Sequence, residues 1–282
     1  MKHNQLKKVK IWRAIQIAVT VIAAFAFLVT SAGSAQADAN KPTIVLVHGA
    51  WADASSWNGV TNRLQADGYK VYAVPNTLRG LAADSAYVAS ILSTIAGPVV
   101  LVGHSYGGAV ITNAAFGNPN IKALVYIDAF VPDQGESLLQ LASTPPPPGQ
   151  PASCLGGDPT AVFNFVPYPG AQNADVDLYI KPELFPSCFA NDLPVPQAAV
   201  LAASQRPITF SALLEPSGTP AWKTIPSWYL VGTLDKVIPP YAQIFMAQRA
   251  NAHIVQVKAS HPAMISRPGA TTELIEDAAQ GN

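Results

Sequence analysis

The strongest fold signal in the sequence is the segment Val99-Val-Leu-Val-Gly-His-Ser-Tyr-Gly-Gly108. Its uninterrupted β-branched and leucine residues predict a buried strand, and the segment 109–115 that follows contains no helix breaker. Between the two lies Gly103-x-Ser105-x-Gly107. A sharp strand-to-helix turn lifts a serine hydroxyl clear of the backbone, and it crowds its neighbours so closely that glycine is favoured two positions on either side. We therefore predict that Ser105 is a catalytic nucleophile.

The same type of apolar run recurs along the chain and predicts a parallel sheet. Strands are expected at 43–47, 71–74, 99–102, 123–127, 227–231 and 254–257, with helices at 57–67, 84–96, 108–116 and 241–250. These runs do not alternate between apolar and polar residues, which is typical of strands that are buried on both faces. Helices must then cover both faces of the sheet.

Two motifs resemble those of the α/β-hydrolase superfamily. One is the turn around Ser105, and the other is the segment Thr43-Ile-Val-Leu-Val-His48-Gly49-Ala50-Trp51, with Trp57 following. Within the superfamily, the chain is most similar to small-molecule carboxylesterases and hydroxynitrile lyases. The resemblance extends from about 41 to 277 and is weakest between 132 and 220. It implies the α/β-hydrolase fold, a mostly parallel central sheet flanked by helices, with an inserted cap.

The chain divides into three parts. Residues 1–37 are expected to be a signal peptide, 38–131 and 221–282 the α/β-hydrolase core, and 132–220 a cap, or lid. The cap region contains four consecutive prolines at 145–148, both cysteines of the chain and many aromatic residues. A disordered linker would be poor in aromatic residues, so an ordered insertion is expected here.

The signal peptide is predicted from a basic segment, an apolar run from 14 to 30 and the small residues Ala35-Gln36-Ala37. The alternative is a single membrane anchor, for which the run is short. Cleavage after Ala37 would leave 12 basic and 17 acidic residues, a net charge of about −5. We expect a secreted or periplasmic protein with no stable membrane anchor and, because no basic excess remains, no nucleic-acid partner. The oligomeric state is not predicted.

A serine nucleophile needs a general base and an acid that orients it. His261 is the predicted base, because it lies after the last strand and before a helix. The resemblance implies a structural role for His48, and His104 is expected to point away from the nucleophile. The acid should lie at the end of a strand between Ser105 and His261. Asp235 fits that position and the family's Gly-x-x-Asp-x-x-Pro turn, with Asp128 as the rival.

Two backbone N–H groups are expected to form an oxyanion hole. One belongs to Tyr106, the residue after the nucleophile, and the other to Ala50 in the His-Gly loop, with Trp51 as an alternative.

The two cysteines, Cys154 and Cys188, are predicted to form a disulfide in an oxidising compartment, with two free thiols as the alternative. No metal site is expected, because two cysteines without a nearby histidine cannot complete a tetrahedral shell.

These residues predict a serine esterase that hydrolyses small to medium apolar carboxylic esters or lactones through an acyl-enzyme, without a cofactor. A cap with few charges favours an enclosed apolar pocket for a small molecule. Three alternatives stay open: a hydroxynitrile lyase-like activity, cofactor-free perhydrolysis and a non-catalytic ligand-binding protein on the same scaffold. The lyase alternative lacks support at two positions, because related lyases carry threonine at Gly49 and lysine at Pro262.

Overall fold

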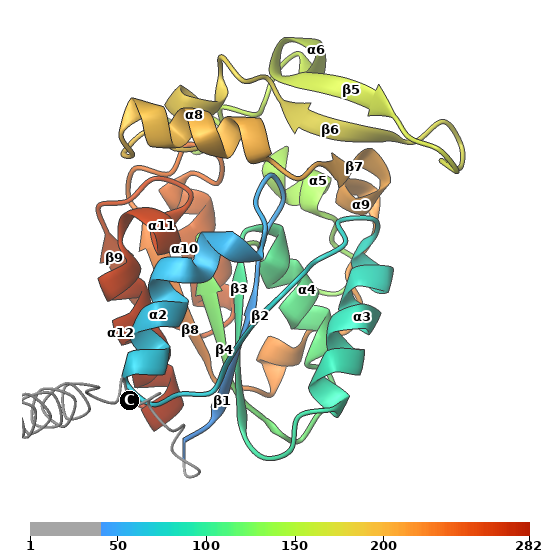
Figure 1. Cartoon of the computed structure of the whole chain (residues 1–282). Helices are drawn as coiled ribbons and strands as arrows, with labels where there is room; N and C mark the ends of the chain where they lie inside the picture. The colour runs from blue at the N-terminus through green and yellow to red at the C-terminus, as the bar shows by residue number, and fades with distance from the viewer. Residues whose placement is uncertain (1–40) are drawn as a thin grey trace, which may run out of the picture. The chain divides into compact units, whose positions relative to one another are not determined.

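The computed structural model describes residues 41–282, so the predicted signal peptide at 1–37 lies outside the described residues. In this part of the chain, no helix combines the length and apolar character that crossing a bilayer requires. The architecture is a central sheet between two layers of helices, with the cap segment (residues 132–220) at one end of the sheet (Figure 1).

The central sheet has six strands, all parallel, in the order β2-β1-β3-β4-β8-β9. Their bounds are β1 Thr43–Val47, β2 Val71–Val74, β3 Val99–His104, β4 Ile121–Ile127, β8 Ser227–Gly232 and β9 His253–Val257. Each of the six predicted strands is found, and the predicted parallel central sheet flanked by helices is present.

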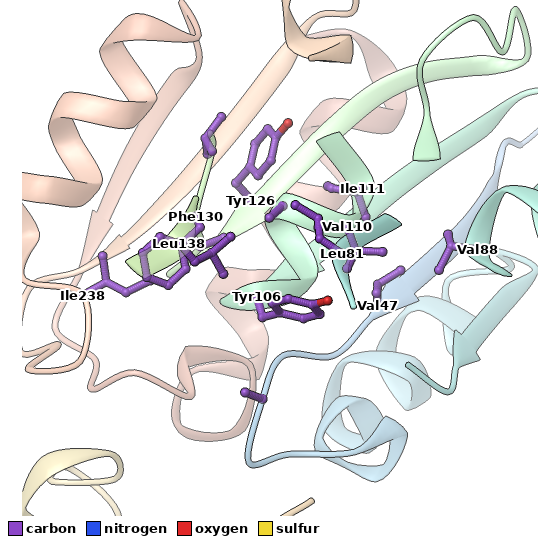
Figure 2. Close-up of a cluster of buried hydrophobic side chains, with 14 of the residues drawn as sticks. Val47, Leu81, Val88, Tyr106, Val110, Ile111, Tyr126, Phe130, Leu138 and Ile238 are labelled. Atoms are coloured by element: carbon purple, nitrogen blue, oxygen red, sulfur yellow. The ribbon is translucent and has the colours of Figure 1, made fainter. Parts of the chain in front are cut away.

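Alternate residues of the strands pack into two apolar clusters, one on each face of the sheet. Ile44 and Leu46 of β1 face α2 (Asn58–Ala66) and α12 (Pro268–Gln280). Val45 and Val47 belong to the opposite cluster, which includes side chains of α3 (Leu81–Ser93), α4 (Tyr106–Ala114) and α10 (Pro240–Arg249). Figure 2 shows part of this second cluster, with Val47, Val88, Val110 and Tyr126 drawn. Burial on both faces explains the continuous apolar runs of β1, β3, β4 and β8. The expectation of burial on both faces is wrong for β2 and β9, which are partly exposed because they are the edge strands of the sheet.

The strand order places the site. After β1 the chain moves to one side of it as β2 and then to the other side as β3. The loops that follow β1 and β3 therefore diverge at a point where the strand order reverses, which is where open α/β sheets bind ligands. The His-Gly loop follows β1, and Ser105 follows β3.

The cap segment is ordered and holds a second, antiparallel sheet of three short strands. Its elements are α5 (Leu138–Ala142), α6 (Pro159–Val162), β5 (Phe163–Pro167), β6 (Val176–Ile180), α7 (Phe185–Cys188), α8 (Val195–Ser204), β7 (Ile208–Thr209) and α9 (Phe210–Leu214). Figure 1 shows most of them above the ends of the central strands. The boundaries 132 and 220 stay a prediction.

The remaining elements are short or terminal. They are η1 (Ala54–Trp57), η2 (Ala221–Lys223) and α11 (Ala263–Ser266). The predicted helix 57–67 corresponds to α2, which begins at Asn58 and ends at Ala66. The 3-10 turn η1 precedes it and is capped by Asp53, which accepts from the N–H of Ser55. The predicted helix 84–96 begins earlier, at Leu81, and ends at Ser93.

Candidate active site

Ser105 lies at a strained turn between β3 and α4. Its φ is 52° and its ψ is −123°, a combination that L-residues rarely adopt. The flanking glycines permit the turn: a Cβ on Gly103 would lie 2.5 Å from the carbonyl oxygen of Gly107, and one on Gly107 would lie 2.5 Å from that of Val47. The crowding expected from the Gly-x-Ser-x-Gly spacing is therefore present in the backbone.

His261 and Asp235 form a buried pair at the same end of the sheet. His261 Nδ1 lies 2.8 Å from Asp235 Oδ2, and both side chains are fully buried. The carboxylate has three further donors: the backbone N–H groups of Val237 and Ile238, at 2.7 and 3.0 Å, and the Gln243 side chain, at 2.7 Å. These bonds fix the carboxylate, which in turn orients the imidazole ring.

Asp128, the rival acid, has no hydrogen bond to His261 within residues 41–282. Its Oδ1 accepts from the N–H of Gly232 at 2.6 Å, and its Oδ2 accepts from the N–H of Ala263 at 3.3 Å. Burial, followed by the charge of Asp235, raises the pKa of the Asp128 carboxyl well above 3.8. Asp128 thus joins the end of β8 to the start of α11 instead of orienting the histidine.

The structure does not join Ser105 to His261 by a hydrogen bond. In the described part of the chain, His261 Nε2 is buried and has no hydrogen-bond partner. Ser105 is 2% exposed. The residue before it, His104, lies against the His261 ring, with 4.7 Å between ring centroids. The structure therefore brings the predicted acid and the predicted base together beside the serine turn, without a hydrogen bond from the predicted base to Ser105.

The predicted oxyanion donors are next to this turn. A Cβ on Gly49 would lie 2.6 Å from Ser105 Cβ, so the loop that carries Ala50 packs directly on the serine. The backbone N–H of Trp51 donates to the carbonyl oxygen of Arg206 at 2.9 Å, so it is not free to act as the alternative oxyanion donor. Within residues 41–282, the backbone N–H groups of Ala50 and Tyr106 donate to no acceptor.

Tyr106 is held by its side chain. Its hydroxyl donates to Asp84 Oδ2 at 2.7 Å, and the phenol is buried beneath the start of α4. Burial raises the pKa of this phenol, with the charge of Asp84 as the next cause, so it remains a neutral donor. Figure 2 shows Tyr106 among the apolar side chains near Phe130 and Leu138.

Two histidines predicted to lie outside the chemistry are buried at the site. His48 Nδ1 donates to the carbonyl oxygen of Gly49 at 2.9 Å, and its Nε2 accepts from the N–H of Asn76 at 2.8 Å. His104 Nε2 donates to the carbonyl oxygen of His261 at 3.0 Å. This last contact joins residues that are 157 positions apart in the sequence, so no local pattern signals it.

The cap segment covers the histidine. The Phe189 ring lies edge-on to His261, with centroids 4.9 Å apart, and Phe185 stacks on Phe189. Cys188, in the same turn, forms a disulfide with Cys154, with the Cα atoms 5.8 Å apart. The predicted pairing is therefore present in the structure.

A mostly apolar cavity of about 240 Å³ is lined by residues that contact Ser105 and Asp235, although neither Ser105 nor His261 lines it. Its wall includes Phe130, whose N–H donates to the Ser105 carbonyl oxygen at 3.1 Å. Val237 and Ile238, which bind Asp235, also line it, together with α5, α10 and the proline segment. No charged side chain lines this cavity. In the described part of the chain, no group of three His, Cys, Asp or Glu side chains is placed to hold a metal ion.

Comparison with known proteins identifies the family. Residues 44–274 match the Alpha/beta hydrolase family, which is more than half of the chain. The chain belongs to this family. The resemblance predicted from the two motifs is confirmed.

This α/β hydrolase is similar to proteins named as esterases and hydrolases. It is 37% identical over 126 residues to a carbendazim hydrolyzing esterase of a Nocardioides species, a match that spans 40% of this chain and 52% of that esterase. It is 28% identical to a pyrethroid hydrolase of Sphingobium wenxiniae over 83% of this chain and 86% of the relative. The solved structure of polyneuridine aldehyde esterase shares its fold, with a TM-score of 0.71 and 22% identity over 84% and 99% of the two chains.

Proposed function

We propose that this α/β hydrolase cleaves carboxylic esters, with Ser105 as nucleophile, His261 as general base and Asp235 as the carboxylate that orients the base. The observation that carries the proposal is the buried Asp235–His261 pair beside the strained serine turn. The esterase and hydrolase names of its relatives support the same reaction class.

The steps follow from the roles of these groups. When the ester is bound, the Ser105 hydroxyl turns to donate to His261 Nε2, a contact that often forms only in the substrate complex. Ser105 Oγ then attacks the carbonyl carbon while His261 takes the proton. The N–H groups of Ala50 and Tyr106 bind the developing oxyanion. His261 returns the proton to the leaving alcohol, and a water molecule that it activates then hydrolyses the acyl-enzyme.

The serine is tested by its replacement. We expect Ser105→Ala to lower kcat for a chromogenic ester by about 10⁴-fold or more while the melting temperature changes little. Ser85→Ala is a matched control, because Ser85 is also buried and its hydroxyl donates to the Val110 carbonyl oxygen, at 3.3 Å. An ordinary rate in Ser105→Ala would refute the proposal. A wild-type protein that binds esters without turning them over would favour the ligand-binding alternative.

The substrate class is proposed from the cavity. Its lining is mostly apolar and has no charged side chain, and three lining residues hydrogen-bond to Ser105 or Asp235, although neither Ser105 nor His261 lines it. A cavity of this kind takes an uncharged apolar group. The proposed substrates are therefore esters or lactones with an apolar aromatic or aliphatic part, of small to medium size.

Filling the cavity tests this assignment. Ala242 of α10 lines it, so Ala242→Phe should lower kcat/KM for p-nitrophenyl esters with long acyl chains and leave the acetate ester nearly unchanged. Ala83→Phe, on the exposed side of α3, is the control. Equal kinetics of Ala242→Phe and wild type across the chain-length series would exclude this cavity as the substrate site.

We also propose that the protein is exported and that residues 1–37 are removed. The Cys154–Cys188 disulfide supports this location, because disulfides persist in oxidising compartments. Intact mass spectrometry of the exported protein should give a chain that begins at Asp38. A full-length chain that remains inside the cell would contradict the proposal.

A further inference from the structure

His104 occupies the position where three loops of the proposed site meet. It is the last residue of β3, directly before Ser105, and it is completely buried. Its ring lies 4.7 Å from the ring of His261. On the other side is the loop after β1, because a Cβ on Gly49 would come within 3.0 Å of His104 Nδ1 and 2.8 Å of the His104 carbonyl oxygen.

The protonation of His104 follows from its partner. Nε2 lies 3.0 Å from the carbonyl oxygen of His261, and a carbonyl can only accept, so Nε2 carries a proton. Nδ1 has no hydrogen-bond partner within the described residues, so nothing there compensates a second proton. Burial lowers the pKa of His104 well below 6.5, and the neighbouring His261 adds to this. His104 is therefore the neutral Nε2–H tautomer.

This hydrogen bond acts on the backbone of the proposed base. Asp235 holds the His261 ring through Nδ1, whereas His104 holds the carbonyl group of the same residue. Within the described residues, the backbone of His261 has no hydrogen bond other than the one from His104. Two anchors, one on the ring and one on the main chain, fix where His261 Nε2 lies relative to the serine turn.

We propose that His104 is a positioning residue for the reaction: its Nε2–H ties the backbone of His261 to the strand end that carries Ser105. The inference rests on the proposed roles of Ser105, His261 and Asp235. Because β3 fixes both His104 and Ser105, the bond sets the distance between base and nucleophile. A misplacement of about 1 Å at such a contact can cost about 100-fold in rate.

The test compares His104→Gln with His104→Met. The Gln side-chain amide can reach the position of Nε2 and donate, whereas Met fills a similar volume and offers no donor. We expect Met to lower kcat about 10- to 100-fold with KM within about threefold of wild type, and Gln to recover most of that loss. The melting temperatures of both variants show whether the chain is folded. Met fills the volume of the histidine ring but donates no hydrogen bond, so a slow His104→Met beside a faster His104→Gln shows that the rate depends on the hydrogen bond and not on packing.

The outcomes separate the two proposals. If Ser105→Ala is inactive but His104→Met has wild-type kcat, His104 does not position the base and the esterase proposal stands. If Ser105→Ala is active, the esterase proposal fails whatever His104 does. If Gln is as slow as Met while both are folded, the donated hydrogen bond is not the cause, and the inference is overturned.

A measurement on the unaltered protein keeps the inference testable if His104→Met does not fold. In ¹⁵N-histidine-labelled enzyme at pH 7, the His104 signals, assigned by their loss in His104→Gln, should be those of a neutral ring with the proton on Nε2. A cationic ring, or a proton on Nδ1, would overturn the inference.

Discussion

At the scale of single residues, two buried carboxyl groups lie at the same end of the sheet and have different partners. Asp235 binds the imidazole of His261, while Asp128 binds the backbone of β8 and α11. Only the first contact can stabilise an imidazolium that forms during the reaction.

The comparison of Asp235→Asn with Asp128→Asn tests this division. We expect Asp235→Asn to lower kcat by about 10² to 10⁴-fold. The amide no longer holds His261 in the required tautomer and does not balance the charge of the imidazolium that forms. Asp128→Asn keeps an oxygen for the Gly232 N–H and should cost less than about tenfold in kcat. Steady-state kinetics of both variants give the two values of kcat to be compared. The opposite ranking would make Asp128 the catalytic acid.

The buried histidines predict how stability depends on pH. Burial lowers the pKa of His48 and lowers that of His104 well below 6.5. Below pH 6.5 the unfolded chain binds protons at these rings and the folded chain does not, so their contribution to the free energy of unfolding falls as the pH drops through 6.5. In urea titrations at several pH values between about 7 and 5, His104→Gln should show a shallower fall than wild type. Equal slopes would mean that His104 is protonated in the folded state.

The proposed catalytic residues carry local signals in the sequence. Ser105 stands in a spacing imposed by a crowded turn, and Asp235 and His261 follow predicted strands. His104 lies inside the quoted motif, yet its role depends on a carbonyl group contributed by a distant loop. Side-chain periodicity carries no information about such a contact, which is why the expectation for His104 did not include it.

At the scale of elements, the turn α7 links the cap segment to both proposed catalytic loops. Cys188 is joined to Cys154, whose N–H donates to the Lys236 carbonyl oxygen at 2.8 Å, next to Asp235. Phe189 covers the His261 ring. The disulfide therefore connects Phe189, which covers the His261 ring, to the turn that carries Asp235.

Removing the disulfide should act on the chemical step as well as on stability. For a loop of 34 residues, chain entropy gives a loss of about 3.5 to 4 kcal/mol in the free energy of unfolding. We expect Cys154→Ser/Cys188→Ser to lower kcat severalfold at a temperature where the variant is fully folded. Kinetics and denaturant titration measure the two effects separately. A variant with altered KM and selectivity but unchanged kcat would show that the bridge constrains only the cap segment.

The inner strands β1, β3, β4 and β8 were predictable because burial on both faces leaves continuous apolar runs. The strands of the cap segment were not. Phe165 and Val166 of β5 are exposed, and β7 has only two residues, so neither strand has the length or the burial that produces a pattern. Their pairing depends on contacts between segments that are distant in the chain.

At the scale of the whole molecule, the parallel sheet brings the ends of β1, β3, β8 and β9 to one edge, and the cap segment encloses what they carry (Figure 1). Ser105 is the proposed nucleophile at this end of the sheet. A fluorophosphonate probe followed by peptide mass spectrometry tests this role, because the probe forms a phosphonyl ester with an activated serine. We expect one covalent adduct, on Ser105, with labelling slowed strongly in His261→Ala. An adduct on another residue, or none on an enzyme that hydrolyses esters, would contradict it.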